Sequence, residues 1–174
     1  MINEHNVTLT PLLDEDVKLF EKWLEKDYIY KRFCPEGEEE REAWLDEIKG
    51  RHDTHHHMKH FIVSVDEQKI GFCLCIDLFH EPEYVKEVYE DLADTIRENE
   101  AYELGYLIGE EIFLNKGFGK IIIKKLEDKV KELGGKMLLA DPSEENIPSI
   151  KVLTANGFQK VKDEDYRKML LKSL

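Results

Sequence analysis

The sequence predicts an α+β fold in which a mixed central sheet of about six or seven strands is flanked by helices. Short runs of β-branched and aromatic residues alternate with longer segments whose apolar residues recur every three or four positions. This is the pattern of strands interleaved with amphipathic helices. No internal repeat and no linker-like composition interrupts the chain, so we expect a single domain over residues 1–174.

Composition and charge narrow the classes of partner. The chain has 38 acidic residues against 25 Lys and Arg, which gives a formal net charge of −13 at pH 7. Nucleic acids and anionic membranes are bound through basic patches, so we expect neither as a partner. The same charge suits a cationic substrate. Hydrophobic residues make up 41% of the chain, which is enough to build a core.

The sequence is expected to belong to a cytoplasmic protein. No apolar run approaches the roughly 18 residues that can span a bilayer. The polar start Met1–His5 lacks the basic and then apolar pattern of a secretory signal. Cys34, Cys73 and Cys75 form no Cys-x-x-Cys pair, so all three are expected to be reduced.

The N-terminal segment predicts one strand and two helices. Residues Val7–Leu12 alternate and are rich in β-formers, which indicates a first strand. Asp14 is a good N-cap for a first helix that continues to about Lys26. Aromatic residues and a proline are interleaved in Tyr28–Gly37, which is therefore expected to be irregular. Glu38–Lys49 is predicted as a second helix because acidic residues fill its first turn.

A histidine-rich segment, His52–His60, has five histidines in nine residues. Histidine is a common ligand of transition metals. However, no His-x-x-x-His pair falls on a predicted helix, and the segment connects a helix to a strand. A solvated loop is the favoured interpretation, while an adventitious and a functional metal site stay open as alternatives. We expect no metal cofactor.

The middle of the chain predicts a hairpin followed by an inserted helix. Phe61–Val65 and Ile70–Ile76 are strands joined by a tight turn. In Leu78–Ala101, apolar residues recur at helical spacing after Pro82, a residue that suits a first turn. This amphipathic helix is expected either to cover the sheet or to form one wall of a substrate cleft. The acidic residues of that wall would be Glu81, Glu83, Glu87 and Asp91.

The rest of the chain is organised around Glu103–Lys120, which predicts a buried strand, a short loop and the start of a helix at Gly117. The first N–H groups of a helix have no intrahelical partners and lie at the positive end of its dipole, so they can bind phosphate. Two glycines permit a close approach and two lysines add charge: Gly117, Gly119, Lys116 and Lys120. On this segment alone, an ordinary strand-to-helix turn is an equally good interpretation.

The remaining elements continue the alternation. The helix after the loop is expected to end at Gly134–Gly135. Met137–Ala140 is predicted as a short buried strand, and a further helix begins near Asn146 and ends at Gly157. Phe158–Val161 and Arg167–Leu171 are predicted as closing strands.

Two motifs of this half resemble those of the GCN5-related N-acetyltransferase (GNAT) family. Lys116-Gly117-Phe118-Gly119 resembles the family's pyrophosphate loop, and Asn146–Phe158 resembles its Asn-x-x-(Ala/Ser)…Gly-Phe signature. The Leu-Ile-Gly-Glu run before the loop, the Ala-Asp-Pro run after the short strand and the inserted helix resemble the aminoglycoside 6′-N-acetyltransferase branch. The resemblance implies one N-acetyltransferase domain with the GNAT fold and an extra helix before its CoA-binding strand.

The resemblance also implies a co-substrate, acetyl-CoA. Its pyrophosphate would lie on the loop residues Asn115, Lys116, Gly117, Phe118, Gly119 and Lys120. The pantetheine arm would run along the strand near Leu107 and Gly109, with Gly109 as a bulge that opens the slot. An N–H of Leu107 or Ile108 would face the thioester oxygen. Asn146 would bind the pantetheine or the region of the sulfur.

Three positions depart from the family pattern. Leu114 replaces a polar residue at the start of the loop, Leu153 stands where members often have a tyrosine acid, and Gly105 stands where many relatives have an aspartate. An amine nucleophile must lose a proton. Glu103, on the same strand face as Gly105, is the candidate for proton transfer, directly or through water. Asp141 is the candidate for substrate binding, and a merely structural charge is the alternative for both.

The leading hypothesis is therefore an N-acetyltransferase that acts on a small polycationic amine such as an aminoglycoside. The second is a protein or peptide amine acetyltransferase that acts on an N-terminal alanine or a lysine. The third, from another class, is a CoA-binding module with little catalysis. The acceptor amine and the oligomeric state stay open, although relatives often form homodimers.

Overall fold

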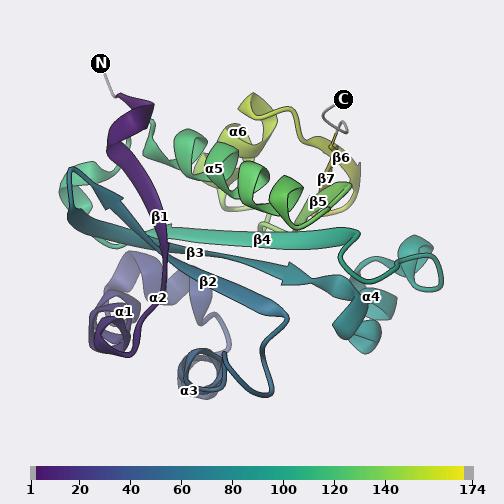
Figure 1. Cartoon of the computed structure of the whole chain (residues 1–174), viewed down its shortest axis with the longest axis horizontal. Helices are drawn as coiled ribbons and strands as arrows, with labels where there is room; N and C mark the ends of the chain where they lie inside the picture. The colour runs from purple at the N-terminus through teal and green to yellow at the C-terminus, as the bar shows by residue number, and fades with distance from the viewer. Residues whose placement is uncertain (1–2, 171–174) are drawn as a thin grey trace. The chain divides into compact units, whose positions relative to one another are not determined.

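The computed structural model describes residues 3–170 and has a seven-stranded sheet with the strand order β1-β2-β3-β4-β5-β7-β6 (Figure 1). The β1–β2, β5–β7 and β6–β7 pairs are antiparallel, whereas β4 and β5 are parallel. The predicted mixed sheet is therefore confirmed. The strands are β1 (Val7–Pro11), β2 (Met58–Val65), β3 (Gln68–Asp77), β4 (Ala101–Ile108), β5 (Met137–Ala140), β6 (Gln159–Lys162) and β7 (Asp165–Met169).

Six α-helices occur among the described residues: α1 (Val17–Leu24), α2 (Asp27–Phe33), α3 (Glu38–Lys49), α4 (Pro82–Val88), α5 (Phe118–Glu132) and α6 (Ile147–Ala155). The backbone contacts divide the chain into two units. The first contains the chain up to Leu74 and Tyr106–Phe118, and the second contains Cys75–Gly105 and the chain from Gly119 onward. Strands β3 and β4 each contribute residues to both units.

In the first unit, α1, α2 and α3 lie on the same side of β2 (Figure 1). Their apolar faces meet in an aromatic core, in which the ring centroids of Phe20 and Phe72 are 4.6 Å apart. The irregular conformation predicted for Tyr28–Gly37 is wrong over most of its length, because α2 ends only at Phe33. Burial of Ile29 in the core holds the extra helix, and Trp44 of α3 donates from its indole nitrogen to the carbonyl of Phe33 at 2.9 Å.

The hairpin prediction is confirmed, with a turn at Asp66 and Glu67 whose φ angles are 47° and 69°. Two successive positive φ angles define the type I′ turn that suits antiparallel strands. The histidine-rich segment is a loop only in part, because β2 already begins at Met58. His60 is buried, and its Nε2 lies 2.7 Å from Oε1 of Glu47. Among residues 3–170, no group of three or more His, Cys, Asp or Glu side chains is arranged so that it could hold a metal ion.

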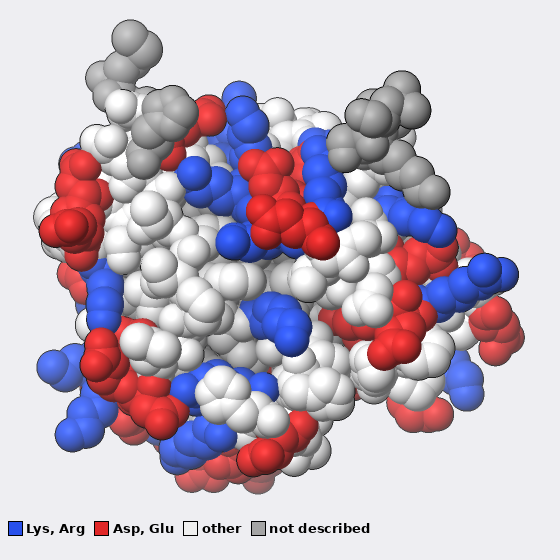
Figure 2. Space-filling model, viewed as in Figure 1, with Lys and Arg blue, Asp and Glu red and all other residues white. Residues whose placement is uncertain are grey.

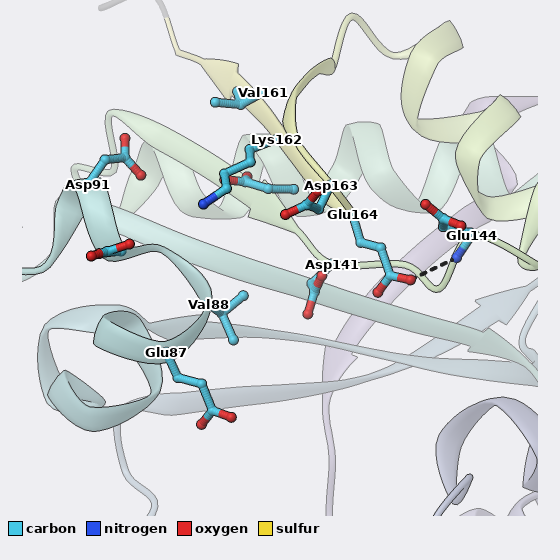
Figure 3. A pocket seen from close by; sticks show the side chains of 11 residues that line it. Glu87, Val88, Asp91, Asp141, Glu144, Val161, Lys162, Asp163 and Glu164 are labelled. Carbon is cyan, nitrogen blue, oxygen red and sulfur yellow. Dashed lines mark hydrogen bonds between the residues drawn. The ribbon is translucent and has the colours of Figure 1, made fainter.

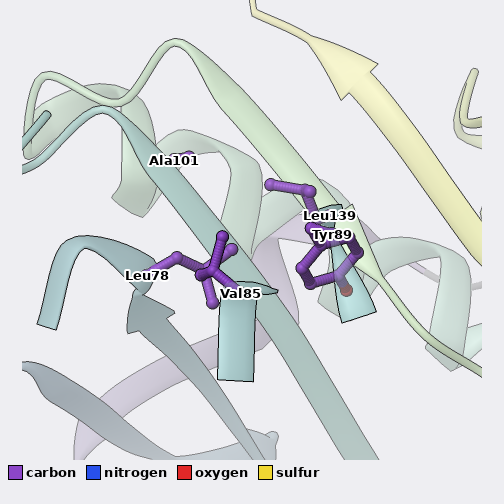
Figure 4. Packing of buried hydrophobic residues seen from close by; sticks show 5 residues of the cluster. All are labelled: Leu78, Val85, Tyr89, Ala101 and Leu139. Carbon is purple, nitrogen blue, oxygen red and sulfur yellow. The ribbon is translucent and has the colours of Figure 1, made fainter. Parts of the chain in front are cut away.

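The single long helix predicted between Leu78 and Ala101 is wrong in length. The α4 helix ends at Val88, and a short 3₁₀ helix (Glu90–Leu92) and turns follow it. The backbone of Tyr89 leaves the helical region (φ −125°, ψ 52°) as the tyrosine ring becomes fully buried. The predicted cover of the sheet is nevertheless present, since a cluster of Leu78, Val85, Tyr89, Ala101 and Leu139 packs there (Figure 4).

The α5 helix packs through Ile122, Leu126 and Val130, each of which is fully buried. Leu133 continues the same apolar spacing but is 39% exposed, because it lies beyond the last helical turn. Gly134 follows with a φ of 89°, as expected for a helix terminus. None of the helices in the described part of the chain has the length and apolar character needed to cross a membrane.

Candidate active site

Strand β4 extends beyond its pairing with β5. The parallel ladder joins Ala101–Glu103 to Met137–Leu139, whereas β4 continues to Ile108. The ladder is short because β5 has only four residues against the eight of β4. The β4 backbone after Glu103 therefore lies outside this ladder, as the predicted slot for an extended ligand requires.

Within the first unit, three side chains from α1, α2 and their junction hold the end of β4. Lys26 Nζ donates to the carbonyl of Gly109 at 2.6 Å, and the Tyr28 hydroxyl donates to the carbonyl of Ile108 at 2.8 Å. Trp23 donates from its indole nitrogen to Glu110 at 2.8 Å, and its ring lies where a side chain at Gly109 would have to be. Only glycine therefore fits beneath the indole.

The backbone of Gly109 has the hydrogen-bond pattern of a bulge. The N–H groups of Gly109 and Glu110 both donate to the carbonyl of Ile70, at 2.7 and 3.1 Å. Two successive donors to one acceptor leave two residues opposite one, as in a β-bulge. The N–H of Gly109 thus donates to β3, and its carbonyl accepts from Lys26. By the alternation of a strand, the N–H of Ile108 points to the edge away from β3.

The predicted phosphate loop joins β4 to α5. Asn115 and Gly117 have positive φ angles of 57° and 86°, which Asn and Gly adopt most readily. Residues 115–117 and Lys120 are exposed, while Phe118 is buried against Phe113 with ring centroids 5.4 Å apart. The helix begins at Phe118, one residue later than predicted. The loop therefore presents exposed backbone N–H groups and lysines immediately before a 15-residue helix.

Within the second unit, two tyrosines of the inserted segment converge on Glu103. The hydroxyls of Tyr84 and Tyr89 donate to the same oxygen of Glu103, Oε2, at 2.8 and 2.5 Å. Tyr89 is fully buried, and the two rings meet edge to face with centroids 6.1 Å apart. The strand, the inserted segment and the carboxylate thus form one buried polar cluster.

Burial raises the pKa of Glu103 to about 7. The two tyrosine hydrogen bonds act in the opposite direction, while the charges of Asp141 and Asp165 raise the pKa further. A carboxylate with a pKa close to neutrality can both accept and release a proton under physiological conditions. The Glu103 side chain therefore has the proton affinity of a general base.

An acidic pocket of about 1000 Å³ lies beside this cluster in the second unit. Eight of its eleven lining residues are acidic: Glu87, Glu90, Asp91, Asp141, Glu144, Asp163, Glu164 and Asp165. Of the four acids predicted for a cleft wall, Glu87 and Asp91 line it, whereas Glu81 and Glu83 do not. Figure 3 shows the α4 residues Glu87 and Val88 across from Asp141 and Glu164.

Asp141 follows directly after β5 and belongs to this lining. Partial shielding from water, followed by the charges of Glu164 and Asp165, raises its pKa to about 6. Glu164 also accepts from the backbone N–H of Glu144 at 3.1 Å, which fixes one side of the pocket (Figure 3). Above pH 6, Asp141 therefore presents a carboxylate in surroundings that favour a cation.

The structure also places three further positions of the family pattern: Asn146, Leu153 and Gly105. Asn146 is the N-cap of α6, where its Oδ1 accepts from the N–H of Ser149 at 3.4 Å. Leu153 is buried in the core, and its hydrocarbon side chain has no proton to donate. Gly105 lies on β4, two residues after Glu103 and on the same face.

Sequence reasoning missed Tyr84, Tyr89, Lys26 and Tyr28. By its spacing, Tyr89 belongs to the apolar pattern of the inserted helix, which says nothing of its hydroxyl. A buried tyrosine usually has a hydrogen-bond partner for its hydroxyl. That rule could have directed attention to a nearby carboxylate, but the sequence does not say which one.

Comparisons with known proteins agree with this architecture. A sequence comparison with curated proteins found no match. An archaeal domain from Methanocaldococcus jannaschii is 23% identical, with a TM-score of 0.71, over 94% of this chain and 98% of that one. The aminoglycoside acetyltransferase AAC(6′)-Ib, in complex with ribostamycin and coenzyme A, is 15% identical, with a TM-score of 0.75, over 94% and 93% of the two chains.

An aminoglycoside N(6′)-acetyltransferase from Legionella pneumophila is 14% identical, with a TM-score of 0.67, over 94% of this chain and 90% of that one. At such identities the structures support the fold alone. The sequence itself is matched over residues 6–159 by a family model described as an acetyltransferase (GNAT) domain. The chain therefore belongs to the GNAT family of acetyltransferases.

Proposed function

We propose that this single-domain protein transfers an acetyl group from acetyl-CoA to a primary amine of a small polycationic molecule. The observation that carries the proposal is the acidic pocket around Asp141, which adjoins the half-buried Glu103. A polycation would neutralise several of the eight carboxylates in that pocket. The likeness to the aminoglycoside acetyltransferase structures supports this substrate class.

Acetyl-CoA would bind along β4 and the loop that follows it. The exposed loop residues 115–117 and Lys120 suit the pyrophosphate, because a helix N-terminus attracts anions. The pantetheine would add to β4 beyond the β5 ladder as an extended strand. Since Gly109 already uses its N–H on Ile70, the N–H of Ile108 is the donor that would stabilise the thioester oxygen.

The chemistry then follows from two carboxylates with different surroundings. Asp141 would hold the ammonium form of the substrate in the pocket. Glu103 does not line the pocket, so a water would carry one proton from the ammonium group to its carboxylate. The free amine attacks the thioester carbon, the C–S bond breaks, and the nitrogen loses its second proton to solvent water as the amide forms. CoA leaves as a thiolate, since a thiol has a pKa near 8.5 and needs no strong acid.

The test is release of CoA thiol from acetyl-CoA with aminoglycosides, polyamines and lysine peptides as acceptors. We expect turnover with polycations. Glu103→Gln should lower kcat by roughly 10²-fold or more and remove the inflection of the pH–rate profile near pH 7. Asp141→Asn should chiefly raise KM for the amine. Glu100→Gln, on a nearby surface glutamate, is the matched control and should change neither constant.

Each alternative predicts a different outcome. Preference for lysine peptides over every polyamine would favour a protein or peptide amine acetyltransferase. No turnover with any acceptor, together with measurable binding of CoA, would leave only a CoA-binding module. If Glu103→Gln keeps full activity at every pH, Glu103 is not the base.

A further inference from the structure

The contacts of Glu103 continue to a second layer of charged groups in the same unit. Tyr89, which donates to Glu103, lies beneath the guanidinium of Arg167, whose Cζ is 5.8 Å from the centre of the tyrosine ring. A cation at that position is attracted by the face of an aromatic ring. Arg167 therefore contacts the residue that supports Glu103 rather than Glu103 itself.

Arg167 is itself held by two aspartates from different elements. It forms a two-pronged pair with Asp91 of the inserted segment, with nitrogen–oxygen distances of 2.6 and 2.8 Å. It also donates to Asp165 at the start of β7, with a shortest distance of 2.6 Å. The side chains of Arg167 and Asp165 are only 11% and 7% exposed. Pairs shielded in this way are stronger than surface ion pairs.

This arrangement joins the inserted segment to β7 at the level of Tyr89. The segment after α4 is otherwise a short 3₁₀ helix and turns, held by the packing of Leu92, Ala93 and Ile96 against the apolar cluster that contains Tyr89. Removal of the guanidinium would also leave Asp91 and Asp165 without their shared cation. Asp165 is one of the charges that act on Glu103, so its neutralisation by Arg167 matters for the proton affinity of Glu103.

We propose that Arg167 is a positioning residue that holds Tyr89 against Glu103, neutralises Asp165, and thereby sets the pH at which Glu103 takes up its proton. The groups that face Glu103 are Tyr84 and Tyr89 from the inserted segment, Asp141 after β5, and Asp165 on β7. The proposal rests on the proposed function only for its consequence in catalysis, because the titration of Glu103 is a property of the free protein.

The direction of the effect follows from the charges. Loss of Arg167 removes a cation, exposes Glu103 to an unpaired Asp165 and loosens the hydrogen bond from Tyr89. All three changes favour the protonated form of Glu103. Its pKa should therefore rise, by about one unit for the loss of a nearby compensating charge. The acidic limb of the pH–rate profile should move to higher pH by the same amount.

The experiment is a carbon-13 NMR titration of the glutamate carboxyls in the unliganded full chain, with the Glu103 signal assigned by its loss in Glu103→Gln. Wild type is compared with Arg167→Gln and with Arg167→Lys. The lysine variant keeps the positive charge but loses the planar guanidinium group that pairs with both oxygens of Asp91. We expect a rise of about one unit in Arg167→Gln and a smaller one in Arg167→Lys. Tyr89→Phe should also raise the Glu103 pKa, since it deletes one hydrogen bond to the carboxylate.

Arg51→Gln is the matched control, because Arg51 is another buried arginine, paired with Asp14 in the first unit. It should lower the melting temperature without moving the titration of Glu103. An unchanged Glu103 titration in Arg167→Gln, or an equal shift in Arg51→Gln, would overturn the inference. These readouts do not require acetyl transfer, so inactivity towards every amine would count against the proposed function alone.

Discussion

Glu103 is the residue at which folding and chemistry have opposite requirements. Its pKa is raised from 4.5 to about 7, so the folded chain binds this proton more tightly than the unfolded chain. The stability that results is complete below about pH 4.5 and is lost as the pH rises through about 7. At pH 8 the side chain of Glu103 is therefore a poorly solvated carboxylate. The ionised form is the one that a base requires, but ionisation lowers the stability of the fold.

Glu103→Gln should therefore stabilise the protein increasingly as the pH rises. Glutamine keeps an oxygen that can accept from the two tyrosines, but it cannot ionise. The gain over wild type should be small at pH 5 and reach on the order of 2–3 kcal/mol at pH 8. Urea unfolding at pH 5, 6.5 and 8 measures the free energies. Asp141 titrates in both proteins, so only the part of its contribution that is coupled to the charge of Glu103 stays in the difference.

The control for this measurement is Glu100→Gln. Lys136 lies 3.0 Å from Glu100 and lowers the pKa of that carboxyl, so its loss should produce no gain at high pH. A difference between Glu103→Gln and wild type that is the same at all three pH values would contradict the raised pKa of Glu103.

At the scale of elements, the loop and the first turn of α5 form the proposed anion site. Gly117→Asp should lower the affinity for CoA by 10-fold or more, because it places a negative charge among the N–H groups that would face the pyrophosphate. Equilibrium dialysis or calorimetry with CoA measures this affinity. Aspartate tolerates positive φ better than most residues, so the fold should survive the φ of 86° at this position.

Gly134→Asp provides a matched comparison at the other end of the same helix. Its φ of 89° makes the backbone penalty nearly equal, and an added Cβ would meet nothing within 4 Å. This variant should bind CoA as wild type does. Equal losses of affinity in the two variants would show that backbone strain, and not charge, is responsible.

The individual helices and strands also show what sequence patterns could predict. The α3 helix, the hairpin and α5 could be predicted because each has a local signal: acidic residues in the first turn of α3, a tight turn between the hairpin strands, and Gly134 after α5. The α2 helix was missed because its aromatic residues and the following Pro35 obscure the period. The inserted helix was predicted too long because a helix followed by a 3₁₀ turn keeps apolar residues at similar spacing.

The candidate site likewise has one part that the sequence could predict and one part that it could not. The phosphate loop is local in sequence, so its glycines and lysines could be recognised directly. The partners of Glu103 are 14 and 19 residues away along the chain, and they meet it only because α4 and the turns fold back over β4. Such contacts depend on packing that a periodic pattern does not specify. The proton affinity of Glu103 could therefore not be predicted from sequence.

For the whole molecule, net charge is the property that acts at long range. The formal charge is −13, and on the face seen in Figure 2 the basic side chains are interspersed with acidic ones rather than gathered into one large patch. A polycation should be attracted over distances comparable to the Debye length, which is about 10 Å at 0.1 M salt. The acidic pocket would add a local attraction to this general one.

We therefore predict that salt weakens the use of a polycationic acceptor while leaving the chemical step unchanged. Between roughly 20 and 300 mM NaCl, kcat/KM for the best polyamine should fall about 10-fold, with kcat nearly constant, at saturating acetyl-CoA. A monoamine acceptor should show a much smaller dependence. Glu87→Gln combined with Glu144→Gln removes two pocket charges and should flatten the salt dependence without lowering kcat. If kcat/KM does not depend on salt, the acidic pocket does not recognise its substrate by charge.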